Sequence, residues 1–282
     1  MEFDRIVNEW MNSFVRNNRE GLRAVRDFLS SIIEFFYGIF SFHFVVLFIL
    51  FAAAAYFSSS GKVWRKAVNT GIVVALLGLV YLLGFWDLAI STLTLVIINM
   101  IIAVIIGVPI GMLISESKLA AKIIIPILDF MQTIPTFVYL IPAIMLFGLG
   151  QVSALLAMLI YSVPFLVRIT YLGATSIDSS SIEASLAFGA NRLQMFTNVK
   201  LPLSIRSIIM GFNQSFLASL SMVVTASMVG AGGLGQEVLA AVNQINLGRG
   251  LRSGICIVII AIIISRITGE LFSKFKYDKE VA

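Results

Sequence analysis

The chain has 282 residues, of which 59% are hydrophobic and 12% are charged. This composition excludes an ordinary soluble domain, because the apolar runs are longer than a soluble core needs, and it predicts an all-α integral membrane protein. The net charge of +5 does not indicate a nucleic-acid partner, because the cations lie mainly in the short loops between apolar runs, where they orient a membrane protein.

The side chains that enzymes and metal sites use are scarce. Cys256 is the single cysteine and lies inside the last apolar run, and His43 is the single histidine. No disulfide can therefore form within the chain, and a histidine metal cluster is impossible. The apolar runs also contain no pair of carboxylates at helical spacing. We expect no catalytic site, no metal and no cofactor in this chain.

Residues 1–41 form a polar amino-terminal segment without the uninterrupted apolar core of a signal peptide. At about residues 21–40, apolar side chains recur at intervals of three and four, as at Leu29, Ile32 and Phe36, and charged side chains face the other way. This pattern predicts an amphipathic helix that lies along the bilayer surface. A soluble partner or the rest of the protein could equally cover its apolar face.

Seven apolar windows are long enough to cross a bilayer, which needs about 20 apolar residues. They lie at residues 42–58, 67–86, 88–114, 123–149, 152–173, 204–230 and 254–273. We therefore expect about seven transmembrane helices: two amino-terminal spans in residues 42–87, a main membrane domain in residues 88–270, and a tail in residues 271–282.

Lysine and arginine clusters orient these windows, because cytoplasmic loops carry an excess of both. The clusters expected in the cytoplasm contain Lys62, Arg65, Lys66, Lys118, Lys122, Arg192, Lys200, Lys274, Lys276 and Lys279. Seven spans would then place the amino terminus outside, although five arginines of residues 5–26 break the trend. The tail and residues 178–202 are thus predicted to be cytoplasmic.

Polar side chains inside the windows are candidates for a translocation pathway or a gate. These candidates are Asp129, Gln132, Thr133, Asn213, Gln214, Ser221 and Thr225. A continuous helix over residues 123–149 would be about 40 Å long, against a core of roughly 30 Å, so Asp129 and similarly Arg168 are expected near the cytoplasmic boundary. Asp129 could equally belong to an interfacial helix start without a transport role. The polar groups of residues 204–230 could equally bond between helices.

Residues 178–202, DSSSIEASLAFGANRLQMFTNVKLP, are the longest polar interval in the membrane-embedded part of the chain. Ser180 followed by Glu183 fits a helix capping box, and Asn191 with Gln194 repeats the pattern. A glycine between the two helices suits a left-handed turn, and a proline is expected to end the second helix. We therefore predict a compact helical knob, although an ordinary loop also fits. A DNA-binding helix-turn-helix is disfavoured, because the segment has only two cations.

A glycine-rich stretch, GAGGLG, follows the sixth window. It matches the dinucleotide-binding pattern G-x-G-x-x-G, but no strand precedes it and no acidic residue lies about 20 positions later. We expect instead an external turn that re-enters toward the membrane, shaped by Gly230, Gly232, Gly233 and Gly235. The chain also lacks the phosphate-binding pattern G-x-x-x-x-G-K-[ST], so any ATP that powers it must bind another chain.

Three stretches in order resemble the glycine betaine/proline betaine permease family over roughly residues 88–270. They are LDFMQTIPTFVYLIPAIMLFGLG, SIEASLAFGANRLQMFTNVKLPL and NQSFLASLSMVVTASMVGAGGLGQEVL. The second resembles the EAA loop of ABC importer permeases, with serine for the second alanine and valine for the usual isoleucine. The loop's matching positions are Glu183, Ala184, Ser185, Gly189, Leu201 and Pro202.

The resemblance implies a type I ABC importer fold in the bacterial cytoplasmic membrane, with the EAA loop docking on an ATPase through Glu183, Ala184 and Gly189, and with Pro202 turning the chain back into the membrane. It implies a second permease copy as a homodimer, two cytoplasmic ATPase subunits that bind ATP and magnesium, an extracytoplasmic substrate-binding protein and surrounding lipid. The implied cargo is a betaine-type compatible solute used in osmoprotection. Choline, carnitine or an amino acid remain alternative cargoes, and an ion-gradient-driven carrier or a scaffold without solute flux remain alternative classes.

Overall fold

The computed structural model describes residues 2–41, 51–53, 56–57 and 63–280, and the regular structure of these residues is entirely helical. The predicted first span, residues 42–58, together with His43, lies largely outside the described residues. The helices are α1 (Glu2–Asn17), α2 (Arg19–Ser41), α4 (Val63–Leu82), α5 (Trp86–Ser115), α6 (Lys118–Thr133), η1 (Thr136–Tyr139), α7 (Leu140–Phe147), α8 (Gln151–Thr175), α9 (Ser179–Ala187), α10 (Arg192–Gln194), η2 (Met195–Lys200), α11 (Leu201–Ser227), α12 (Gly233–Asn243) and α13 (Leu247–Glu280).

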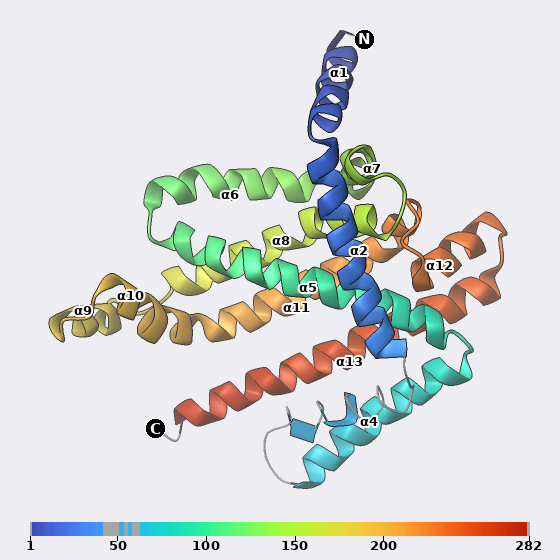
Figure 1. Ribbon diagram of the computed structural model, residues 1–282. Coiled ribbons are helices and arrows are strands. Elements are labelled where there is room, and N and C mark those ends of the chain that lie inside the picture. The colour runs from blue at the N-terminus through green and yellow to red at the C-terminus, as the bar shows by residue number, and fades with distance from the viewer. Residues whose placement is uncertain (1, 42–50, 54–55, 58–62, 281–282) are drawn as a thin grey trace.

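Helices α5, α8 and α11 form the central body of the molecule, and α9 and α10 project from one end of it (Figure 1). The three helices approach closely because glycines lie at their contacts. A Cβ on Gly111 of α5 would lie 2.6 Å from the Val167 carbonyl of α8, and a Cβ on Gly173 of α8 would overlap Ser207 of α11. Small residues at such crossings are the usual basis of helix packing in membranes. The central body is therefore tightly packed.

Four helical segments in the described part are long and apolar enough to span a membrane: Trp86–Ser115, Gln151–Thr175, Arg192–Ser227 and Leu247–Glu270. The predicted window 67–86 corresponds to a shorter apolar helix, Lys66–Leu82. The last helix continues to Glu280, so the predicted tail begins as part of α13. The prediction of seven spans therefore counts this shorter helix, and it also counts a first span that lies largely outside the described residues.

The window 123–149 was expected to form one continuous helix, and this prediction is wrong. Helices Lys118–Thr133 and Thr136–Phe147 meet at a bend of 105°. The break falls at Ile134, which has an extended backbone (φ −66°, ψ 131°) and precedes Pro135. A proline disfavours the helical conformation of the residue before it, which explains the break. We call α6, η1 and α7 together the broken span.

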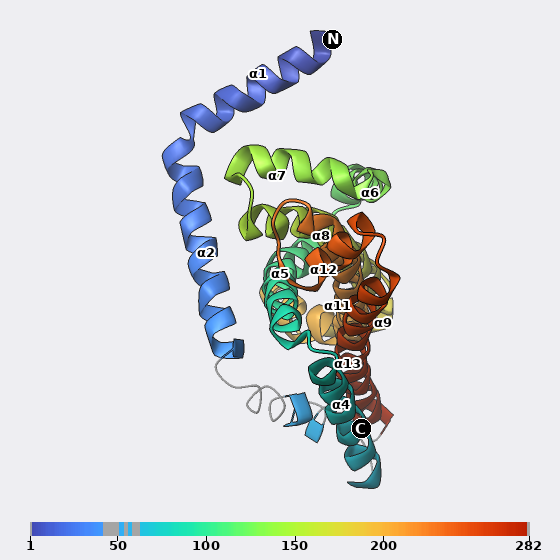
Figure 2. The same cartoon turned by 90° about the vertical axis from the view of Figure 1, so that its right-hand side faces the viewer.

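Helix α2 confirms the predicted amphipathic helix, and the rest of the protein covers part of its apolar face. Ile33 is buried, and Leu29, Ile32 and Phe36 pack against the core cluster that includes α5 and α8. Figure 2 shows α2 along one side of the helical body, with α1 extending away from it. Helix α1 itself was not predicted from the sequence.

Candidate coupling site and translocation pathway

The knob of residues 178–202 begins with an aspartate cap on α9. The Asp178 Oδ1 atom accepts from the Ser180 backbone N–H at 3.5 Å, and the Ser180 hydroxyl donates to Asp178 Oδ2 at 2.6 Å. The predicted capping box of Ser180 and Glu183 is therefore wrong, because α9 begins at Ser179 and Ser180 already lies in its first turn. Asp178 provides the side-chain acceptor that the exposed N–H groups of this turn need.

Gly189 ends α9 in the left-handed conformation that its sequence context predicted, with φ +79°. The Ala190 N–H donates to the Ser185 carbonyl at 3.0 Å, and the Gly189 N–H donates to the Leu186 carbonyl at 2.9 Å. These two bonds form a Schellman motif, which satisfies carbonyls that the end of a helix leaves free. The glycine turn is thus a defined structure that sets the direction of α10.

The second helix of the knob opens with the predicted capping box. The Asn191 N–H donates to Gln194 Oε1 at 2.9 Å, and the Gln194 N–H donates to Asn191 Oδ1 at 2.9 Å. The expected helix end at Pro202 is wrong, because a π-helical turn, η2, leads directly into α11. The wider turn directs the Leu201 N–H to the Phe196 carbonyl. Pro202, which has no N–H to donate, then lies in the first turn of α11, where that donor is not required.

The tip of the knob exposes apolar as well as polar side chains. Glu183, Ala184 and Gly189 are exposed, and Ser185 is half-buried. Phe188, between α9 and the glycine turn, is 93% exposed. An isolated large aromatic side chain in this position has no partner within the described part of the chain that would cover it. The knob therefore presents a mixed acidic and apolar surface of the kind that docks on another protein.

Two contacts fix the base of the knob to the central body. The Lys200 Nζ atom donates to the Glu116 carboxylate at the end of α5, and the Lys200 side chain is only 13% exposed. Met195 is buried beside this contact and lines a groove of about 580 Å³ together with Leu113 and Phe196. The knob is thus anchored on α5 as well as on α11.

The first group of predicted pathway residues lies on the broken span. Asp129 accepts from Arg168 of α8, the Gln132 Nε2 atom is buried without a hydrogen-bond partner, and the Thr133 hydroxyl donates to the Phe130 carbonyl at 2.8 Å. Asp129 lies eleven residues after Lys118, which is about 16 Å along α6. Asp129 therefore lies in the second half of α6, and its expected position near the cytoplasmic boundary stays a prediction.

The second group of predicted pathway residues lies on α11 and divides into two kinds. Asn213 accepts from the hydroxyl groups of Ser265 and Thr268 of α13, at 2.9 and 3.5 Å, and so bonds between helices. Gln214 and Ser221 are exposed, and Thr225 is half-buried. The Ser221 hydroxyl donates only to the Leu217 carbonyl of its own helix. The latter three residues thus form a polar stripe on the open side of α11.

A buried polar cluster in the central body was not predicted. The Asn99 Nδ2 atom of α5 donates to Ser162 Oγ of α8 at 3.0 Å and to Ser219 Oγ of α11 at 2.6 Å. The Ser215 hydroxyl of α11 donates to the Ser162 carbonyl at 2.8 Å. Asn99 is the single amide side chain in the window 88–114. An amide in an otherwise apolar span was the feature of the sequence that could have indicated this cluster. The cluster joins the three central helices.

The glycine stretch after α11 forms a turn and then enters α12. Gly230, Gly232 and Gly233 have positive φ angles, and the Gly150 N–H donates to the Val229 carbonyl at 2.7 Å. Gly235 lies within α12, where a Cβ would be 2.5 Å from the Val223 carbonyl. The Leu234 N–H donates to the Thr92 hydroxyl of α5 at 2.8 Å. The turn therefore seats α12 against α5 and α11.

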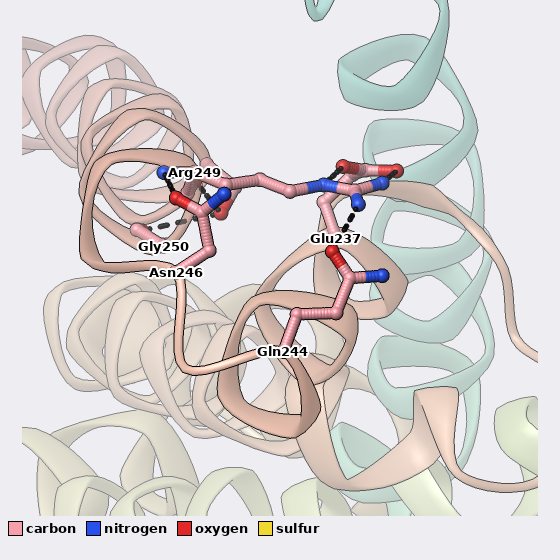
Figure 3. Close-up of polar contacts among 6 residues, drawn as sticks. Glu237, Gln244, Asn246, Arg249 and Gly250 are labelled. Carbon is pink, nitrogen blue, oxygen red and sulfur yellow. Dashed lines mark hydrogen bonds and ion pairs between the residues drawn. The ribbon is translucent and has the colours of Figure 1, made fainter.

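An arginine at the corner between α12 and α13 bonds the two helices to each other (Figure 3). Arg249 donates from Nε and Nη2 to the two oxygens of Glu237, at 2.6 and 3.0 Å, and from Nη1 to Gln244 at 3.1 Å. Asn246 accepts from the Arg249 N–H at 3.0 Å. Such a bidentate pair holds two helices in a fixed orientation. This corner was not among the predicted sites.

A multi-span helical body with a projecting helical knob and polar residues on an open helix face is the architecture of a multi-pass membrane protein and is compatible with a transport subunit. The family model described as "Binding-protein-dependent transport system inner membrane component" matches residues 103–274, and the chain belongs to this family. The protein is thus a permease subunit of an ABC importer, located in the cytoplasmic (inner) membrane, and not an enzyme. Its family implies an ATPase and a binding protein as partners.

Several curated relatives are similar over most of the chain. The chain is 43% identical over 232 residues to the glycine betaine transport system permease protein OpuAB of Bacillus subtilis, with 82% of this chain and 80% of the relative covered. It is 43% identical over 218 residues to the glycine betaine/carnitine transport permease protein GbuB of Listeria monocytogenes, with 77% and 76% covered. It is 45% identical over 186 residues to the glycine betaine/proline betaine transport system permease protein ProW of Escherichia coli, of which it spans 52%.

A solved structure shares the fold. A chain of the inward-facing MetNI methionine ABC transporter superimposes with a TM-score of 0.60 at 21% identity, over 66% of this chain and 93% of that chain. The similarity confirms the type I ABC importer fold.

Proposed function

We propose that the chain is the permease of an ATP-driven importer for glycine betaine, proline betaine or a closely similar compatible solute. The observation that carries the proposal is the 43% identity to a relative named for glycine betaine transport, of which the chain covers 80%. Other relatives are named for carnitine or for trimethylamine N-oxide. All these solutes are small, and each contains a nitrogen that carries a positive charge and methyl groups.

The knob would be the docking site for the cytoplasmic ATPase. Glu183, Ala184 and Gly189 are exposed on it, and Phe188 supplies a large apolar contact beside them. The Schellman turn and the capping box make the knob rigid before it binds, which lowers the entropy cost of docking. Its helical continuity with α11 would convert a movement of the ATPase into a tilt of that span.

The complete importer would contain two permease copies, expected as a homodimer, two ATPase subunits that bind ATP and magnesium, and an extracytoplasmic binding protein that captures the cargo. Gln214, Ser221 and Thr225 on the open side of α11 would face the pathway between the two copies, because an exposed glutamine is costly against lipid. Asp129 and Gln132 would lie beside this pathway as gate residues. The glycine turn at Gly230 and Gly232 would lie on the external side.

Uptake by the reconstituted complex tests the proposal. The permease, together with its partner ATPase and binding protein, would be placed in vesicles, and radiolabelled glycine betaine would be supplied outside with ATP inside. We expect uptake that requires ATP and the binding protein. Unlabelled proline betaine, carnitine, choline, trimethylamine N-oxide and methionine serve as competitors, and competition by methionine alone would overturn the betaine assignment.

An ionophore separates this mechanism from an ion-gradient-driven carrier. At constant ATP, the ionophore should leave the uptake rate unchanged, because the proposed energy source is ATP hydrolysis. Loss of uptake on addition of the ionophore would contradict the proposal and favour a secondary carrier.

A further inference from the structure

An ion pair joins the broken span to the central body. The Arg168 Nη2 atom of α8 donates to Asp129 Oδ1 of α6. The Arg168 side chain is 34% exposed and the Asp129 side chain 47% exposed, so the pair lies at the edge of the helix contact. No other ion pair reaches α6 among the described residues.

The apolar contact between α6 and the central body is separate from the main core. Leu128 of α6 packs with Ile114 and Val167, and the partly buried Ala121, Ile124, Ile125 and Met131 of α6 pack against this cluster. Phe130 and Ile123, on the other side of α6, are 66% and 56% exposed. The Arg168–Asp129 pair adds to this apolar cluster a directional polar contact between α6 and α8.

Two structural features connect α8 to the knob. Arg168 lies seven residues before Thr175, the last residue of α8, and the knob begins shortly after it at Asp178. In addition, α8 packs tightly on α11, since a Cβ on Gly211 of α11 would lie 3.2 Å from the Ile169 Cβ. A tilt of the knob and α11 must therefore carry Arg168 with it.

Helix α6 carries an unsatisfied polar group close to the ion pair. The Gln132 Nε2 atom, one turn beyond Asp129, is buried without a hydrogen-bond partner. A buried donor without a partner is costly, so a second position of α6 that gives Gln132 an acceptor would compensate for part of the cost of moving.

We propose that Arg168 and Asp129 are positioning residues that transmit the movement of the ATPase-bound knob to the broken span. Through this pair, α6 follows α8 when the knob tilts, and the pathway beside α6 changes its width. The inference rests on the proposed function, because it assumes that an ATPase moves the knob.

A double-mutant cycle in the reconstituted complex tests the proposal. Asp129→Asn keeps the shape of the side chain and removes its charge, and Arg168→Gln replaces the guanidinium by a shorter neutral amide. Each should lower uptake per ATP hydrolysed on the order of tenfold, while ATPase binding is retained. The double variant should lose no more than either single variant, because both act through one contact. The control Arg5→Gln with Glu9→Gln removes an exposed pair of α1, and it should transport normally.

Losses that multiply in the double variant, or single variants with normal uptake per ATP, would overturn the proposal. Failure of either single variant to bind the ATPase would also overturn it, because the pair would then serve folding alone.

A distance measurement makes the test independent of cargo. Spin labels on Phe130→Cys and Leu172→Cys, both exposed positions, would be introduced in a Cys256→Ala background. On addition of ATP to the complex, the distance between the labels should stay constant in the chain with the pair and change in the double variant. The same distance change in both proteins would overturn the inference. Absence of ATP-driven uptake by the unmodified chain, with the distances as expected, would instead overturn the proposed function.

Discussion

Lys200 of the π-helical turn donates to Glu116 at the end of α5, although the two residues lie 84 positions apart. The contact fastens the base of the knob to a helix other than those that it connects. A force applied to the tip is therefore passed to α5 as well as to α8 and α11. The knob is therefore attached to all three helices of the central body.

Charge reversal at the tip of the knob should uncouple transport. We expect Glu183→Lys to insert and fold normally, because the side chain is exposed, but to lower ATP-driven uptake by at least roughly tenfold, since like charges in an interface oppose docking. The matched control is Glu20→Lys on α2, which is also exposed. Uptake in vesicles and co-purification of the ATPase measure the effect, and normal uptake by Glu183→Lys would refute a docking role for this residue.

Substitution at the glycine turn should affect the knob through the backbone alone. A Cβ on Gly189 would meet no heavy atom within 4 Å, but φ is +79°. We expect Gly189→Ala to destabilise the turn by about 1–2 kcal/mol, and Gly189→Asn to cost less, because asparagine tolerates the left-handed conformation better. Hydrogen exchange of the Ala190 amide, which bonds to Ser185, reports the loss. Equal protection in both variants and the original chain would contradict this account.

A methyl group at the contact of α12 and α11 should separate the two helices. Gly235→Ala would place a Cβ 2.5 Å from the Val223 carbonyl, and backbone cannot give way cheaply. We expect a loss of about 1–3 kcal/mol in stability, seen as a lower midpoint of thermal unfolding in detergent. Gly254→Ala is the control, because a Cβ there meets nothing within 4 Å. A similar midpoint for the two variants would show that α12 is not held closely.

Acid should loosen the first turn of α9. Hydrogen bonds from the Ser180 hydroxyl and N–H lower the pKa of the Asp178 carboxyl. A lowered folded-state pKa means that the cap stabilises the helix above the carboxyl's unfolded pKa and loses this effect as the pH falls through the folded value. We therefore expect faster exchange of the α9 amides, corrected for intrinsic rates, below about pH 4. Asp178→Asn should remove this pH dependence while retaining a cap, and an unchanged dependence would rule out Asp178 as its source.

Elements that depend on local patterns could be predicted from the sequence. The apolar windows identified α5, α8 and α11, and the spacing of Asn191 and Gln194 identified a cap. The break before Pro135 was missed because hydrophobicity continues across it, although the proline provides a local reason for it. The cap of α9 was misassigned because Asp178 and Ser180 both suit such a position, and only the helix start decides between them.

Contacts between distant residues could not be predicted in the same way. Asn99, Ser162 and Ser219 meet only because α5, α8 and α11 pack together with a particular rotation. Arg168 was expected near the cytoplasmic boundary without any assigned partner, and it bonds to Asp129 because α6 lies beside α8. A helical period specifies which side chains share a face, but not which face of another helix lies opposite.

The π-helical turn of residues Met195–Lys200 links the knob to α11 without a break. An α-helix rotates by about 100° per residue, whereas a π-helical turn accommodates one residue more than an α-helical turn. Removal of one residue within the π-helical turn would therefore restore ordinary α-helix and leave the tip of the knob facing nearly the same direction. Removal of one residue from α11 itself would rotate the tip by about 100° about the axis of that helix. An ATPase would then meet a different side of the same helix, so the extra residue makes this joint tolerant of a deletion that α11 would not tolerate.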